Sequence, residues 1–439
     1  MNRRLVSFFL PATISVLLFG SCKKDDHFPH GTHPSLYSSE VLDKWMTLQL
    51  RLMKNATGIP NQAFSRPFAY AGIAALESLS PGLPANWDNK WNGLTGLPTS
   101  SHSAKYYYPA NVNAALAAIN KAFFPNASAV DKLAIDSLEA ALKESFLTTQ
   151  TPGLINSSSD FGKAVATAVF NWSESDGYKI ANNPYTPPVG PGLWKPTPPA
   201  FAAAATPYLG NDRTVIIGSI NNTQPPAPVS YSTDPGSAFF AMVKEVYDAS
   251  LTLTDDQKNM ATFWRDVPGA TTPGHWLSIL QQAINKTHAR LDKAALAYAL
   301  TGSSINDGAI SVWKSKYQYN LVRPITYIRE VMGYATWNSF LGTPAHPEYS
   351  SAHAVLSGAA AATLEKLFGN IGSFTDHTYD YLGFPPRTFN SFTAIAEEAG
   401  QSRLYAGIHY LSSIHAGLVQ GRKVAANIFS KHQNNKTDK

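Results

Sequence analysis

Residues 344–353 read Pro-Ala-His-Pro-Glu-Tyr-Ser-Ser-Ala-His and lead directly into an alanine-rich run. Prolines and serines favour turns, whereas the run that follows predicts a helix over 352–368. Ser350 or Ser351 is suited to cap that helix, because a serine oxygen accepts hydrogen bonds from first-turn N–H groups. The free N–H groups and the positive end of the helix dipole make such a start an anion site. His353 then lies in the first turn, where it can exchange a proton near neutral pH. A capped helix whose histidine packs locally is the alternative.

Two cations precede this stretch. Lys316 and Arg323 are seven residues apart in a segment that we predict as one helix over 310–331. Seven residues make almost two helical turns, so both side chains would project from one face. A shared oxyanion would relieve their repulsion, because arginine offers a fork of donors and lysine a point charge. A solvated cationic face is the alternative, although neighbours such as Tyr317 and Val322 are not typical of a surface.

A third pair of candidates follows the alanine-rich run. Arg403 and His409 are six residues apart, and Gly407 lies between them. In one continuous helix the two side chains would point to different faces. Gly407 predicts a break, so that Arg403 closes one helix and His409 opens the next. They would then add a third cation and an imidazole to the anion site; a surface arginine and a core histidine are the alternative.

Helical periodicity dominates the rest of the chain. Apolar residues between Val41 and Leu52 recur at three- and four-residue steps, which is typical of an amphipathic helix. Further helices are predicted over 68–79, 112–123, 130–147, 160–172, 278–300, 389–399 and 412–429. No run of alternating β-branched residues is long enough to predict a sheet. The sequence therefore predicts an all-α fold of bundled helices.

Residues 181–235 interrupt this pattern with many prolines. Proline lacks an N–H and fixes φ, so helices cannot cross this stretch. It is either a long ordered loop or a linker, and such loops commonly line a site or cover another subunit. We place a boundary here, between an N-terminal helical half (37–235) and a C-terminal helical half (236–431) that carries the predicted anion site.

The N-terminus has the layout of an export signal. Residues 1–22 start with two arginines, continue with an apolar stretch and end in Gly20-Ser21-Cys22. Cys22 is the one cysteine of the chain, so an internal disulfide is impossible. Its place after small residues resembles the lipidation site of a bacterial lipoprotein, with an ordinary signal peptide as the alternative. Residues 23–36 are polar and are predicted to be a flexible tether.

This layout predicts an exported protein, anchored by lipid to the bacterial cell envelope and facing the periplasm or the cell surface. After the signal no stretch approaches the roughly 18 apolar residues that a spanning helix needs, so membrane contact would be through the lipid only. The chain has 439 residues, of which 44% are hydrophobic, and a net charge of only +5. No basic stripe interleaves with aromatic residues, so nucleic acid is not an expected partner.

The three groups of candidates occur in a familiar order. Lys-x6-Arg-Pro, Ser-x-His and Ser-Arg-x5-His, all within 316–409, resemble the signature shared by vanadium-dependent haloperoxidases and the type 2 phosphatidic acid phosphatase (PAP2) superfamily. The resemblance implies helical bundles of the haloperoxidase and acid phosphatase type. It also implies vanadate as cofactor, hydrogen peroxide and a halide as reactants, and often a homo-oligomer.

The family's roles carry over to matching positions. Oxyanion binding falls on the side chains of Lys316, Arg323, Ser351 and Arg403 and on the N–H of Ala352. The catalytic roles fall on three residues. His353 is the acid–base, His409 binds vanadium through a ring nitrogen, and Lys316 polarises the bound peroxide.

Two departures and two further matches bear on the activity. Ala352 replaces the family's usual glycine, and Ser413 replaces the aspartate that orients the imidazole in the phosphatases. Trp313 lies where haloperoxidases carry a tryptophan near the oxyanion. His346 lies where bromo- and iodoperoxidases resemble each other in carrying a second histidine. We therefore predict a haloperoxidase that oxidises bromide or iodide.

Two other functions remain open. One is a periplasmic acid phosphatase of the PAP2 type, in which His409 attacks a small phosphomonoester and His353 protonates the leaving group. Such an enzyme would bind phosphate and need no vanadate. The other is a glycan-binding surface lipoprotein, for which 9 Trp and 20 Tyr would offer stacking surfaces. That function has no need for three cations and two histidines in this order.

Overall fold

The computed structural model describes residues 33–84, 91–100, 105–266 and 271–433. The predicted signal peptide, Cys22 and most of the predicted tether lie outside the described residues. Within them, helices predominate and the one two-stranded sheet is a short hairpin. The predicted all-α class is confirmed. No helix in these ranges is both long and apolar enough to cross a membrane.

The α-helices are α1 (Glu40–Asn55), α2 (Ser65–Glu77), α3 (Tyr108–Phe123), α4 (Ala129–Leu147), α5 (Pro152–Ser173), α6 (Ala238–Leu251), α7 (Asp255–Phe263), α8 (Thr272–Thr287), α9 (Leu291–Tyr319), α10 (Pro324–Glu330), α11 (Ala352–Phe368), α12 (Phe392–Tyr405) and α13 (Leu411–Gln433). Short 3-10 helices are η1 (Pro34–Leu36), η2 (Asn61–Phe64), η3 (Ser80–Gly82), η4 (Tyr178–Ile180), η5 (Leu209–Asn211) and η6 (Asp380–Leu382). Strands β1 (Phe374–Asp376) and β2 (Arg387–Phe389) pair antiparallel.

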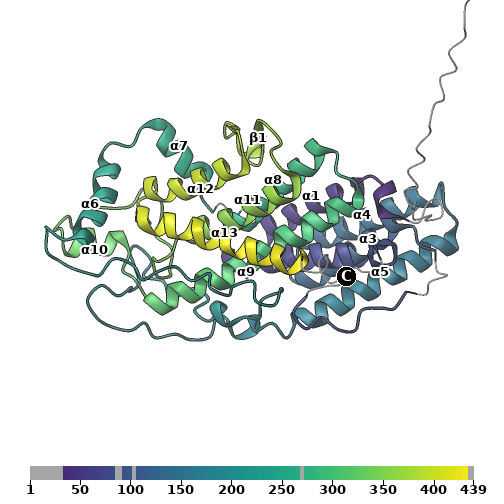
Figure 1. Ribbon diagram of the computed structural model, residues 1–439, viewed down its shortest axis with the longest axis horizontal. Helices are drawn as coiled ribbons and strands as arrows, with labels where there is room; N and C mark the ends of the chain where they lie inside the picture. Colours follow the sequence, from purple (N-terminus) through teal and green to yellow (C-terminus); the bar gives the residue numbers. More distant parts are fainter. Residues whose placement is uncertain (1–32, 85–90, 101–104, 267–270, 434–439) are drawn as a thin grey trace, which may run out of the picture.

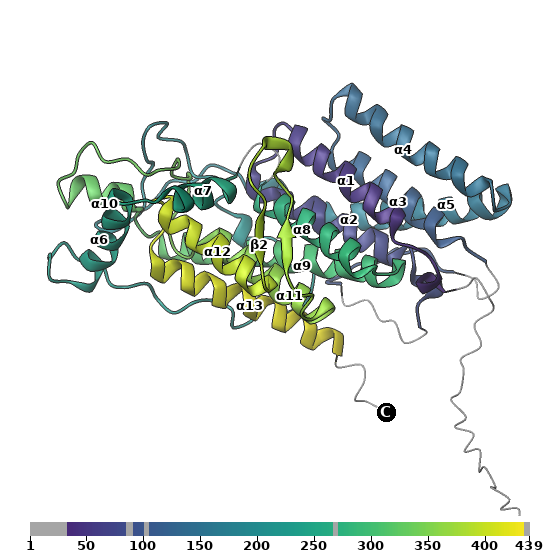
Figure 2. The same ribbon diagram turned by 90° about the horizontal axis from the view of Figure 1, so that it is seen from above.

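The molecule is elongated. Helices α1 to α5 occupy one end, whereas α6 and α10 lie at the other, and α7 lies beside α12 (Figures 1 and 2). The long helix α9 connects the two ends and packs against both α2 and α11.

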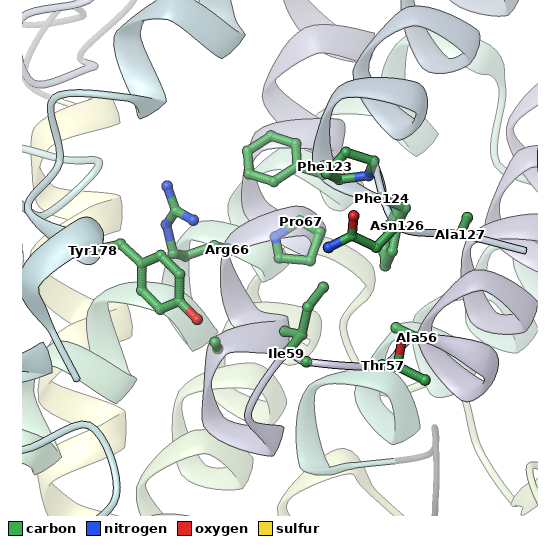
Figure 3. Close-up of a pocket in the computed structure, with 13 residues that line it drawn as sticks. Ala56, Thr57, Ile59, Arg66, Pro67, Phe123, Phe124, Asn126, Ala127 and Tyr178 are labelled. Carbon is green, nitrogen blue, oxygen red and sulfur yellow. The ribbon is translucent and has the colours of Figure 1, made fainter.

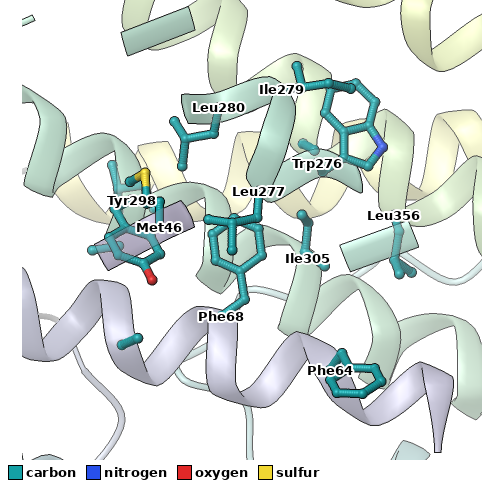
Figure 4. Close-up of a cluster of buried hydrophobic side chains, with 14 of the residues drawn as sticks. Met46, Phe64, Phe68, Trp276, Leu277, Ile279, Leu280, Tyr298, Ile305 and Leu356 are labelled. Carbon is teal, nitrogen blue, oxygen red and sulfur yellow. The ribbon is translucent and has the colours of Figure 1, made fainter. Parts of the chain in front are cut away.

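One hydrophobic core runs through both predicted halves. Figure 4 shows Phe68 of α2 beside Leu277 of α8, with Ile305 of α9 and Leu356 of α11 in the same buried cluster. Helices α2 and α9 can approach closely because Gly72 has no Cβ. A Cβ added there would lie 2.6 Å from a backbone oxygen of α9. The stretch between the halves therefore does not separate two cores.

The proline-rich residues 181–235 are an ordered loop that packs against the segments carrying the predicted site. Leu193 forms an isolated antiparallel bridge with Leu321, and the N–H of Ala205 donates to the carbonyl of Ala345 over 2.8 Å. These contacts hold the loop against the segments that precede α10 and α11, so it is a packed loop and not a linker.

Two predicted helices are each interrupted in the structure. The predicted helix over 278–300 is two helices, because His288 has φ of 49° and ends α8. The predicted helix over 310–331 is also broken, at Asn320, whose φ is 46°. Asparagine tolerates this left-handed conformation, and the following Pro324 starts α10 at the position where a missing N–H costs nothing. Lys316 and Arg323 therefore do not share a helix face.

The end of the predicted tether is also fixed. Pro34–Leu36 form η1, and Pro34 is buried. Arg290 donates from Nε to the carbonyl of Ser35 over 2.9 Å, and from its guanidinium to the carbonyl of Leu36. Residues 33–36 are therefore docked on the start of α9. The prediction of flexibility is wrong for these four residues.

Glycines set the distance between the two helices that carry the site. A Cβ at Gly421 of α13 would lie 2.1 Å from the carbonyl oxygen of Val355 in α11, and one at Gly417 would lie 2.8 Å from that of Ser351. Only a hydrogen fits at these positions. The close crossing brings the start of α11, with Ser351, against the first turns of α13.

Candidate active site

The structure brings all six main candidates together at helix ends. Lys316 lies in the last turn of α9, Arg323 precedes α10, and Arg403 lies in the last turn of α12. Ser351 is the N-cap of α11. His353 follows in the first turn of that helix, and His409 lies two residues before α13. Gly407, with φ of 75°, makes the predicted break between Arg403 and His409.

Lys316 is fully buried and donates to three backbone carbonyls. Its Nζ lies 3.0 Å from the oxygen of Pro347, 3.0 Å from that of Glu348 and 2.7 Å from that of Ser350. An ammonium has three protons, so these contacts use all of them. Burial, and secondly the neighbouring Arg323, hold the pKa of Lys316 well below its usual value. In this arrangement Lys316 fixes the 347–350 segment and must give up one carbonyl to bind an oxyanion.

Arg323 is equally buried and ties several segments together. Its Nε donates to the carbonyl of His346 over 2.9 Å, and its Nη1 to that of Ile408 over 2.8 Å. Nη1 also lies 3.3 Å from Nε2 of His409. Burial lowers the pKa of Arg323 to about 10, which leaves it charged at neutral pH. The proton directed at His409 is the one best placed to turn to an anion beside that ring.

The ring of His409 is oriented by a carboxylate that the sequence analysis did not single out. Nδ1 of His409 lies 2.7 Å from Oε1 of Glu348. Because a carboxylate accepts, the proton belongs on Nδ1 and the lone pair on Nε2. Burial, and then Arg323 and Lys316, hold the pKa of His409 well below its usual value. The ring is therefore neutral, with Nε2 available as a ligand atom or a nucleophile.

His353 has the opposite tautomer. Its Nε2 lies 3.0 Å from the carbonyl oxygen of Trp264, so Nε2 carries the proton and Nδ1 the lone pair. Oδ1 of Asp266 lies 3.6 Å from the same Nε2. Burial, and then Arg403, lower the pKa of His353 to about 4. A neutral His353 can accept a proton at Nδ1, and Asp266 would then stabilise the imidazolium.

The guanidinium of Arg403 is held by two hydrogen bonds. Its Nε donates to Oγ of Ser402 over 2.9 Å, and its Nη2 to the carbonyl of Ala261 over 3.0 Å. Burial lowers its pKa to about 10, although Asp266 opposes the shift. Since a guanidinium has five N–H donors, these two contacts leave further protons for an anion.

The start of α11 has unused polar groups. Oγ of Ser351 is buried and has no hydrogen-bond partner among the described residues. It does not cap its own helix, and the N–H of Ala352 has no place in the intrahelical ladder. A buried hydroxyl without a partner is costly, and an oxyanion would supply the missing acceptor. The residues present therefore fit a tetrahedral anion such as vanadate or phosphate.

The remaining candidates surround this group. The rings of Trp313 and His346 lie 5.1 Å apart, and Nδ1 of His346 faces Nη2 of Arg323 at 3.0 Å. The same Nδ1 also lies 3.3 Å from the carbonyl oxygen of Pro347. Oγ of Ser413 donates to Oε2 of Glu348 over 2.6 Å, so the serine belongs to the carboxylate that orients His409.

Sequence reasoning missed Glu348 and Asp266. Glu348 lies inside the quoted stretch, directly after Pro347, where no periodicity marks a carboxylate as buried. Asp266 follows α7, far along the chain from the residues it serves. Their partners are the only signal, because buried cations require counter-charges.

A separate cavity of about 180 Å³ lies among the N-terminal helices (Figure 3). Ile59, Phe123 and Tyr178 contribute to its mostly apolar lining, and Arg66 is its charged residue. That arginine is already paired with Asp176 at 2.8 Å. None of the predicted site residues lines this cavity, so its shape alone does not identify the chemical centre.

Comparisons with known proteins agree with this geometry. The family model described as the VCPO second helical-bundle domain matches residues 296–437. The crystal structure of the first bacterial vanadium-dependent iodoperoxidase is 32% identical, with a TM-score of 0.80, and the match covers 90% of this chain and 96% of that chain. No curated protein sequence matches the chain.

Two structures of a bacterial vanadium-dependent chloroperoxidase share the fold at lower identity. The holo form is 17% identical with a TM-score of 0.65, covering 86% of this chain and 93% of that chain. The apo form is 15% identical with a TM-score of 0.64, covering 86% and 95%.

The fold and the site define a helical protein with a buried, cation-lined centre that contains two histidines. The chain belongs to the vanadium-dependent haloperoxidase family.

Replacing Lys316 with methionine should lower the free energy of unfolding by about 3–5 kcal/mol, because three buried carbonyls and Glu348 lose their cation. Urea unfolding of the vanadate-free protein measures this change. Lys314→Met is the matched control, since Lys314 is exposed on the same helix, and should stay within about 0.5 kcal/mol. Equal stability of the two variants would contradict the role of Lys316 in fixing the 347–350 segment.

The pKa of His353 predicts a loss of stability in acid. Its folded pKa of about 4 is below the unfolded value of about 6.5. The unfolded state therefore binds more protons below pH 6.5, and stability falls as the pH drops from about 6.5 to about 4. At pH 5 the expected loss from this residue is about 2 kcal/mol.

Urea unfolding at pH 7.5 and pH 5 tests this expectation. In His353→Gln the difference in stability between the two pH values should shrink by about 2 kcal/mol. The variant's stability at pH 7.5 gives the cost of the substitution itself. An unchanged difference would show that His353 does not titrate as the geometry requires.

Proposed function

We propose that this protein is a vanadium-dependent haloperoxidase that uses hydrogen peroxide to oxidise iodide or bromide to the hypohalous acid. The observation that carries the proposal is the pairing of a neutral His409, whose Nε2 lone pair faces Arg323 at 3.3 Å, with the unpartnered Oγ of Ser351. One supplies a ligand atom and the other a donor for the same anion. The similarity to a bacterial iodoperoxidase supports the same activity.

Each residue has a defined task in this reaction. His409 would hold vanadate through Nε2, and Arg323, Arg403, Ser351 and the N–H of residue 352 would bind its oxygens. Bound there, vanadate would supply a Lewis acid that activates hydrogen peroxide toward a halide. His353, which is neutral, would take up the proton of the peroxide at Nδ1.

We base the halide preference on three grounds. His346 packs against Trp313, and its Nδ1 faces Arg323. Bromo- and iodoperoxidases resemble each other in carrying a second histidine at this position. The similar structure is that of an iodoperoxidase. Iodide is also the more easily oxidised halide, so we propose iodide first and bromide second.

A phosphatase remains the second candidate, and Glu348 favours it. Ser413 replaces the family aspartate, but the carboxylate of Glu348 orients His409 instead. The ring thus keeps the support that a nucleophile needs. A phosphomonoester would then be the substrate, and the same oxyanion donors would bind its phosphoryl group.

One assay on chain 23–439 separates the two activities. Metal-stripped protein is loaded with orthovanadate, and iodide and bromide oxidation by hydrogen peroxide are followed; p-nitrophenyl phosphate hydrolysis is measured on vanadate-free protein. Iodide oxidation should depend on vanadate and fall at least about 100-fold in His409→Ala. His377→Ala, in which an exposed histidine is removed, should keep full activity. Phosphate release without halide oxidation would make the protein an acid phosphatase.

We also propose that the protein is a lipoprotein of the bacterial cell envelope. Arg3, Arg4, the apolar stretch and the position of Cys22 support this location. Cells grown with a radiolabelled or clickable fatty acid should label the full-length chain but not its Cys22→Ala variant. Equal labelling of both, or none of either, would contradict lipidation at this cysteine.

A further inference from the structure

We propose that Glu348 is the positioning residue that holds His409 in the tautomer with a free Nε2 lone pair, in place of a carboxylate at position 413. The inference deepens the proposed function and rests on it for the role of His409. It assigns to the 344–353 stretch a task beyond starting a helix, because the same stretch orients the ligand histidine.

The side chain of Glu348 is completely buried and accepts three hydrogen bonds. Oε1 receives Nδ1–H of His409 over 2.7 Å and the N–H of Tyr410 over 3.0 Å. Oε2 receives the hydroxyl of Ser413 over 2.6 Å. All three donors belong to the segment that starts α13. Glu348 therefore fixes the ring and the backbone that carries it together.

The backbone of Glu348 is fixed as firmly as its side chain. Its N–H donates to the carbonyl of Leu321 over 3.0 Å, and its carbonyl accepts from Nζ of Lys316 over 3.0 Å. The carboxylate thus cannot move away from His409 without breaking contacts to the end of α9. A side chain anchored at both ends leaves the imidazole one orientation.

The chemistry of the partners requires an acceptor. A carboxylate accepts at both oxygens, so it matches two N–H donors and a hydroxyl without conflict. The other tautomer, with the proton on Nε2, would put the lone pair of Nδ1 against Oε1 of Glu348, which is repulsive. The hydrogen bond therefore selects the tautomer, and Nε2 of His409 faces Arg323 and the oxyanion donors.

Ser413 complements this arrangement. A second carboxylate at position 413 would lie against the first, and two like charges at that distance cannot both stay ionised. A hydroxyl in that position donates to Oε2 of Glu348 instead. Glu348 and Ser413 thus form a matched pair. In this pair the orienting carboxylate comes from the loop before α11 and not from α13.

The tautomer can be read without vanadate. Protein labelled with ¹⁵N-histidine should show His409, assigned by its loss in His409→Gln, as the Nδ1–H form in two-bond ¹⁵N–¹H spectra. Glu348→Gln keeps an acceptor and should keep this form. Glu348→Ala should give a mixture of tautomers. An unchanged Nδ1–H form in Glu348→Ala would overturn the inference.

Binding of orthovanadate, measured by calorimetry, is the second readout. Loss of an orienting partner commonly costs 10- to 100-fold in affinity, so we expect a weakening of about that size in Glu348→Ala and a smaller one in Glu348→Gln. Glu77→Gln is the matched control, because Glu77 is also a buried carboxylate that accepts from an indole, that of Trp91, over 2.6 Å. It should bind orthovanadate as the unchanged protein does.

A rescue variant separates positioning from general damage. Glu348→Ala combined with Ser413→Asp restores a carboxylate on the α13 side, and should recover most of the affinity and the Nδ1–H form. If Glu348→Ala does not fold, Glu348→Gln carries the test: an orthovanadate affinity equal to that of the unchanged protein would overturn the inference.

The outcome is distinguishable from failure of the proposed function. If the unchanged protein oxidises no halide yet binds orthovanadate, the haloperoxidase proposal fails, and the affinity and tautomer measurements still decide the role of Glu348. If halide oxidation is present, but neither the tautomer of His409 nor the affinity for orthovanadate changes in Glu348→Ala, the positioning role fails alone.

Discussion

The active site depends on the contact between the ammonium group of Lys316 and the three carbonyls around it. A charge this deeply buried needs acceptors at every proton, and the 347–350 segment supplies them. The contact sets the path of the chain between α10 and α11. That path directs the side chain of Glu348 toward α13 and places Ser351 at the start of α11. A cation expected to act only on the anion thus also shapes the pocket that receives it.

Charge balance explains why this centre can exist in a hydrophobic interior. Lys316, Arg323 and Arg403 are buried cations, and like charges so close would be unstable without compensation. Glu348 and Asp266 provide two negative charges, one beside His409 and one beside His353. Each carboxylate serves a histidine and offsets a cation at once. The remaining positive charge favours an anionic ligand.

Structure outside the centre keeps these groups in place. The proline-rich loop is tied to α9 by Asp307, whose carboxylate accepts the N–H groups of Val215 and Ile216 and the hydroxyl of Ser219. Glycines at the α11–α13 crossing let the two helices approach until Gly421 meets the backbone of α11. The loop packs against segments that carry the site, and the close crossing sets the relative positions of its two histidines.

The sequence by itself determined the helical class and the family resemblance, and it predicted the six main site residues, because helical periodicity and motif spacing are local properties. It also predicted the break at Gly407 and the helix start at Ser351. It misplaced Lys316 and Arg323 on one helix, since the helical periodicity continues across Asn320. The left-handed backbone conformation of that residue ends α9. Only the tertiary structure decided that Lys316 spends its protons on carbonyls and that Glu348 orients His409. These contacts join residues 31 to 61 positions apart, and no local pattern records which distant segments a buried charge will meet.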